Sequence, residues 1–65
     1  MEIYETNEMD FTKSVSFLNW FENEIGTEIE LNEVSEDLFY LMCYDLTPKE
    51  VKKVREFENK LADEK

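Results

Sequence analysis

The side chains of this chain that could do chemistry are almost all carboxylates. Between Ser14 and Pro48 the sequence has no lysine, arginine or histidine. The same stretch holds eight acidic residues, namely Glu22, Glu24, Glu28, Glu30, Glu33, Glu36, Asp37 and Asp45. Close pairs of carboxylates, such as Glu28 with Glu30 or Glu33 with Asp37, can perform acid–base catalysis or hold a divalent cation. A row of carboxylates can equally bind a positively charged partner, so the remaining residues must decide between these uses.

The other reactive side chains are missing or isolated. The absence of histidine removes the commonest general base and a frequent zinc ligand. Cys43 is the only cysteine, so no intrachain disulfide can form, and an acidic, apolar neighbourhood does not activate a thiol. One glycine is too few for a phosphate-binding loop, and no calcium-loop pattern is present. We therefore expect no enzymatic activity, no catalytic residue, no metal site and no cofactor.

The charges are sorted along the chain. Residues 1–48 contain twelve acids and one base, whereas residues 49–65 contain five acids and six bases, and the formal net charge is −10. Carboxylates two apart on a strand lie about 6–7 Å from one another, which is close to the spacing of phosphates along a nucleic-acid strand. Such a surface would be attracted to the basic groove of a nucleic-acid-binding protein and repelled by nucleic acid and by anionic lipid.

Solubility and helix capping explain only part of the acidic stretch. Acids in the first turn of a helix are favourable, which accounts for Glu36 and Asp37 if a helix begins there. Glu22 and Glu24 stand near an expected helix end, where the helix dipole disfavours anions. Trp20 lies off the expected apolar stripe, so it is either an interface anchor or packs under the N-terminal segment or Tyr4. We assign partner binding to Glu22, Glu24, Glu28, Glu30, Glu33, Glu36, Asp37 and Trp20.

Three segments carry helix signals. The first spans about 10–25, with Asp10 as N-cap, Gly26 after its end and an apolar stripe at helical spacing. The second spans about 35–45 and is apolar on every side, so it must be covered on every side or leave an exposed patch. The third spans about 48–63 and opens with a capping box at Thr47 and with proline at its first position.

These segments predict a mainly α, compact three-helix domain. Two short segments, 2–6 and 27–31, are also compatible with a minimal two-stranded β pairing. A chain of 65 residues makes a single small domain, 1–65. Neither a signal-peptide run nor a membrane-spanning run is present, and a lone cysteine suits a reducing compartment, so we expect a cytoplasmic protein.

In size and charge the chain resembles the small acidic inhibitors that phages and mobile elements encode against host nucleic-acid enzymes, including nucleic-acid mimics and inhibitors of restriction or CRISPR nucleases. The resemblance covers composition alone. We expect an acidic inhibitor or regulator that binds a basic surface of a nucleic-acid-binding protein. The alternative is a helical assembly module or antitoxin-like partner that uses the apolar segment 35–45. The protein would be a monomer in the first case and could be a homodimer in the second.

Overall fold

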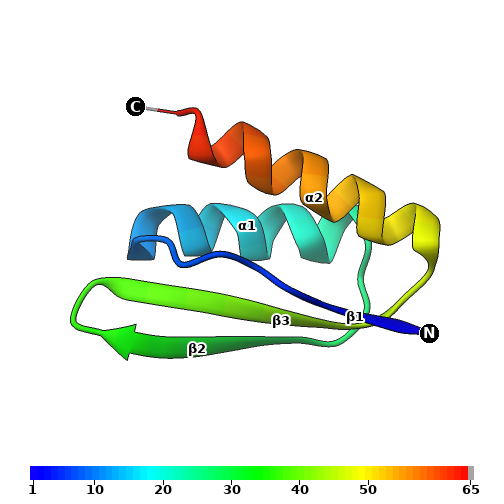
Figure 1. Cartoon of the computed structure of the whole chain (residues 1–65), viewed down its shortest axis with the longest axis horizontal. Helices are drawn as coiled ribbons and strands as arrows, with labels where there is room; N and C mark the ends of the chain where they lie inside the picture. The colour runs from blue at the N-terminus through cyan, green and yellow to red at the C-terminus, as the bar shows by residue number, and fades with distance from the viewer. Residues whose placement is uncertain (65) are drawn as a thin grey trace.

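Two helices pack on one side of a three-stranded antiparallel sheet in the computed structural model, which describes residues 1–64 (Figure 1). Along the chain the elements are β1 (Glu2–Glu5), α1 (Phe11–Glu24), β2 (Ile29–Ser35), β3 (Leu38–Leu46) and α2 (Pro48–Ala62). The strand order is β1-β3-β2, so β3 is the central strand. The protein therefore has an α+β fold, and the prediction of a mainly α three-helix domain is wrong.

The error lies in the segment 35–45, which forms the β2–β3 turn and most of β3 instead of a helix. A continuous apolar run satisfies a buried strand as well as a buried helix, and periodicity alone does not separate the two. The run is short and rich in aromatic residues, which favours a strand. Only one face of this strand enters the core: Leu41 and Cys43 are buried against the helices, whereas the residues that alternate with them remain partly exposed.

The two segments expected to be extended do form strands, but they do not pair with each other. Glu2 of β1 lies opposite Leu46 of β3, and Ile29 of β2 lies opposite Cys43 of β3. β3 lies between β1 and β2, because its nine residues pair with β1 along one edge and with β2 along the other. The proposed two-stranded ribbon of 2–6 and 27–31 is thus replaced by a three-stranded sheet.

Both remaining helices begin and end where local signals place them. The side chain of Asp10 accepts from the backbone N–H of Lys13 at 2.8 Å and caps α1. Gly26 follows the C-cap with φ of 82° and donates its N–H to the carbonyl of Phe21, which ends α1. At α2, Thr47 and Glu50 form the reciprocal capping box that the sequence predicts.

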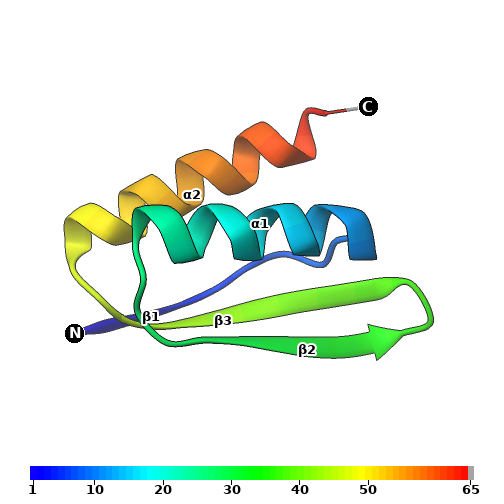
Figure 2. The same cartoon turned by 180° about the vertical axis from the view of Figure 1, so that it is seen from behind.

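The core lies between the sheet and the two helices. Its buried apolar residues come from α1, β3 and α2, and they are Phe17, Phe21, Leu41, Cys43, Leu46, Val54 and Leu61. Seen from the front and from behind, both helices lie on the same side of the sheet (Figures 1 and 2). The opposite side of the sheet is covered by no element within residues 1–64.

Candidate functional site

The acidic residues assigned to partner binding are all exposed, and they follow the chain from the end of α1 along β2 to the β2–β3 turn; we call them the acidic row. Glu22 and Glu24 lie in the last turns of α1, and Glu28 precedes β2. Glu30 and Glu33 belong to β2 itself. Glu36 and Asp37 form the turn between β2 and β3. At about 3.3 Å per extended residue, the part of the row from Glu28 to Glu33 is roughly 17 Å long.

The pleat of β2 divides this row between two faces of the sheet. Glu33 lies opposite Phe39, while Glu30 lies opposite Met42. Because successive side chains alternate, Glu30 points to the side away from the helices and Glu33 to the other side. Glu28, two residues before Glu30, shares its side.

That side of the sheet is called here the open sheet face. Its central residues lie on β3 and its flanking carboxylates lie on or beside the two edge strands, and together they are Glu5, Glu28, Glu30, Tyr40, Met42 and Tyr44. The Tyr44 hydroxyl donates to Oε1 of Glu30 at 3.4 Å. Partial desolvation, followed by the nearby carboxylates of Glu30 and Glu28, raises the pKa of the Tyr44 hydroxyl. This tyrosine therefore stays protonated at neutral pH beside two carboxylates.

Asp37 has a structural role in addition to its charge. Its Oδ1 accepts a hydrogen bond of 3.1 Å from the backbone N–H of Phe11, at the N-terminus of α1. An anion at this end of a helix is favoured by the helix dipole. The β2–β3 turn therefore helps to cap α1, although the helix that the sequence predicted Asp37 to begin does not exist.

Trp20 packs on the second helix. Its ring is parallel to that of Phe57, with centroids 4.3 Å apart and an interplanar angle of 3°. The Phe17 ring is tilted by 57° to that of Trp20, with the two centroids 6.0 Å apart. Trp20 is half-buried, and its ring packs between α1 and α2. The sequence predicted either an exposed anchor or packing under the N-terminal segment or Tyr4, and neither alternative included this contact with Phe57.

A buried carboxylate lies outside the acidic row. Glu58 of α2 is 4% exposed and accepts two hydrogen bonds of 2.5 Å, from the Tyr4 hydroxyl and from the backbone N–H of Asn7. The guanidinium of Arg55 lies 5.9 Å from the centre of the Tyr4 ring. Phe57 packs half-buried beside the core, and Glu58 takes the buried position four residues after Val54.

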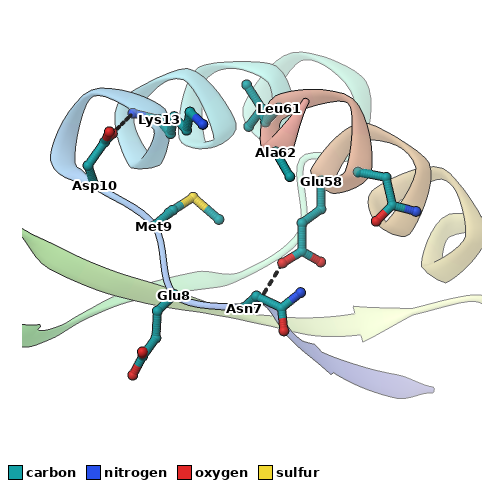
Figure 3. A pocket seen from close by; sticks show the side chains of 9 residues that line it. Asn7, Glu8, Met9, Asp10, Lys13, Glu58, Leu61 and Ala62 are labelled. Atoms are coloured by element: carbon teal, nitrogen blue, oxygen red, sulfur yellow. Dashed lines mark hydrogen bonds between the residues drawn. The ribbon is translucent and has the colours of Figure 1, made fainter. Parts of the chain in front are cut away.

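Glu58 also borders a hollow of about 220 Å³ between the 7–10 segment and the end of α2 (Figure 3). Met9 and Leu61 form apolar parts of its wall. The hollow is smaller than the usual site for a drug-sized ligand, and its buried carboxylate already has protein partners. The hydrogen bonds of Glu58 beside the hollow hold β1 and the segment after it against α2.

The remaining reactive groups show no catalytic arrangement. Cys43 is fully buried, and burial followed by the charge of Glu58 raises the pKa of its thiol to about 12. Within residues 1–64, no three of the cysteine, aspartate and glutamate side chains gather closely enough to hold a metal ion. Neither helix in that range has the length and apolar character needed to cross a bilayer.

Comparison with protein-family models, with characterised proteins and with solved structures finds no match for this chain.

Proposed function

We propose that this protein is an acidic inhibitor or regulator that binds a basic surface of a nucleic-acid-binding protein. The observation that carries the proposal is the separation of charge between the layers of the fold. Within residues 1–64 every lysine and arginine lies in a helix, while the strands and the β2–β3 turn carry acids alone. The exposed carboxylates of the sheet and of the turn present negative charge to an approaching partner.

Folding does not require the repulsion among these exposed carboxylates. Like charges on neighbouring positions cost a few tenths of a kcal/mol per pair, and lysines on β2 would remove that cost. Only Asp37 within the exposed row makes a hydrogen bond to the backbone of another element. A complementary basic surface offsets the remaining repulsion and speeds association through long-range steering.

The alternative of a helical assembly module loses its basis. That module depends on an apolar helix at 35–45, and the segment is instead a central strand whose two edges are already paired. We further propose that the protein acts in the cytoplasm, does not bind nucleic acid directly and needs no cofactor.

The test is capture of partners from a nuclease-treated bacterial lysate at low and high salt. The bait is either the natural chain or a variant in which Glu28, Glu30 and Glu33 are all changed to Lys. We expect the natural chain to retain nucleic-acid-binding proteins that high salt releases, and the variant to lose them. A captured protein must then lose affinity for its nucleic acid when this chain is added. Equal retention by the two baits would contradict the proposal.

A further inference from the structure

The central strand has a second apolar side that the core does not use. Leu41 and Cys43 are fully buried against the helices. Tyr40, Met42 and Tyr44 alternate with them and therefore lie on the open sheet face, where each side chain remains partly exposed. Two tyrosines and a methionine thus form a contiguous, partly exposed strip on this face, as contact sites often do.

Carboxylates flank this row on both sides. Met42 lies between Glu5 of β1 and Glu30 of β2, which are its partners across the two ladders. Neighbouring strands are about 4.8 Å apart, so the two carboxylates border a strip roughly 10 Å wide. Tyr44 is tied to Glu30 by the hydroxyl contact described above.

No lysine or arginine within residues 1–64 lies on the strands that form this face. The lysines and arginines of residues 1–64 lie in α1 and α2, which cover the opposite side of the sheet (Figures 1 and 2). A second copy of this chain is a poor occupant, because face-to-face pairing would bring glutamates against glutamates. The charge of the face calls for a cationic partner.

Arginine fits this combination better than lysine. A guanidinium group is planar and weakly hydrated, stacks on the faces of aromatic rings and binds carboxylates through two hydrogen bonds. A lysine ammonium is a strongly hydrated point charge that gains less from tyrosine rings. Methionine between the tyrosines adapts its shape to the stem of a long side chain.

We propose that the open sheet face is the docking surface for an arginine-rich surface of the partner protein. The inference rests on the proposed function and deepens it, because it selects one face of the acidic layer and one basic side chain. Glu22, Glu24 and Glu33 then contribute long-range attraction, while Glu30 and the tyrosines make contact.

The experiment uses hexa-arginine and hexa-lysine peptides as probes at low ionic strength, followed by NMR of the isotope-labelled chain. We expect hexa-arginine to bind at least about threefold more tightly than hexa-lysine. The largest shifts should fall on Tyr40, Met42 and Tyr44. Both probes carry the same charge, so a preference between them reports contact chemistry and not net attraction.

A matched pair of charge reversals locates the contact. Glu30→Lys and Glu24→Lys each reverse one exposed glutamate and change the net charge equally. We expect Glu30→Lys to weaken hexa-arginine binding by about tenfold and Glu24→Lys by less than about twofold. Tyr44→Leu, which keeps an apolar residue on the strand, should remove the preference for arginine while leaving the fold intact by circular dichroism.

The outcomes separate the two proposals. Equal losses in the two glutamate variants, or shifts confined to the end of α1, would overturn the docking face and leave the general acidic interaction standing. Equal affinity for the two peptides would also overturn it. No binding of either peptide at low salt would contradict the docking face and the proposed function together.

Discussion

The hydroxyl of Tyr4 donates a hydrogen bond of 2.5 Å to Oε1 of Glu58, which joins the first strand to the last helix across 54 positions of sequence. Oε2 of the same carboxylate accepts from the backbone N–H of Asn7. A single buried carboxylate therefore holds β1 and the segment after it against α2.

Removing this carboxylate should be costly. Glu58→Ala leaves the Asn7 N–H and the Tyr4 hydroxyl without their acceptor, and we expect the free energy of unfolding to fall by about 2–4 kcal/mol. Urea unfolding followed by circular dichroism measures the loss. Glu56→Ala on the same helix is the control, because that side chain is exposed, and its effect should stay within about 0.5 kcal/mol. Similar losses in the two variants would contradict the assignment.

Stability should decline at alkaline pH through Tyr4. Burial, followed by the hydrogen bond to Glu58, raises the pKa of Tyr4 from 10.0 to about 12. The folded state thus binds this proton more tightly than the unfolded state, so its contribution is complete below pH 10 and is lost as the pH rises toward 12. Unfolding free energies measured from pH 9 to 12 should fall less steeply in Tyr4→Phe than in the natural chain. Lysine titration is common to both proteins, so identical slopes would count against this role for Tyr4.

The Cys43 thiol should be unreactive in the folded protein. It is fully buried, and its pKa is raised from 9.0 to about 12, so little thiolate is present or accessible at neutral pH. We expect a chromogenic disulfide reagent to react more than about a hundredfold more slowly with the native chain than with the chain in concentrated urea. A small thiol peptide exposed to the same urea concentration corrects for solvent effects. Rapid native reaction would show that β3 opens readily.

The two leucines that face each other across β2 and β3 should differ sharply. Leu41 is fully buried, whereas its partner Leu31 is 39% exposed. Leu41→Ala should cost about 2–5 kcal/mol, a large share of the stability of a domain of this size, and Leu31→Ala about 1 kcal/mol or less. Because the same substitution is made at two paired positions, thermal unfolding of the two variants shows how far the core extends from β3 toward the edge strand β2. Comparable losses would be inconsistent with the packing.

Asp37 should stabilise α1 from the hairpin turn. Asp37→Ala removes the acceptor of the Phe11 N–H, and we expect a loss of about 0.5–1 kcal/mol. Asp37→Asn keeps an acceptor oxygen and should recover part of this loss. Glu36→Ala, at the neighbouring exposed position, is the control in chemical unfolding. Equal effects at the two positions would indicate general charge relief in place of a specific cap.

The helices could be predicted from the sequence because local chemistry determines their ends. Asp10 and Gly26 mark α1, and the Thr47–Glu50 box marks the start of α2. These signals act within a few residues and do not depend on the rest of the fold. The structure confirms the first and third predicted helices to within one or two residues at each end.

Neither β3 nor the open sheet face could be predicted in the same way. The residues 38–44 are all apolar or aromatic, so they show neither a period of two nor one of 3.6. Only the partners on both sides distinguish Leu41, which enters the core, from Met42, which does not. The acidic row was visible as composition, but its division between two faces depends on the register of β2 against β3.

The position of β1 has a consequence for the order of folding. Its partner strand lies about forty residues away, since Glu2 is opposite Leu46, whereas β2 and β3 are joined by a short turn. Closing the longer loop costs more chain entropy, so the hairpin of β2 and β3 should nucleate first and β1 should dock late. Detachment of β1 from the folded protein would require breaking the Tyr4–Glu58 hydrogen bond, and it would bare one edge of β3. By pairing with β3, the N-terminal strand keeps the backbone N–H and C=O groups along that edge from pairing with another chain.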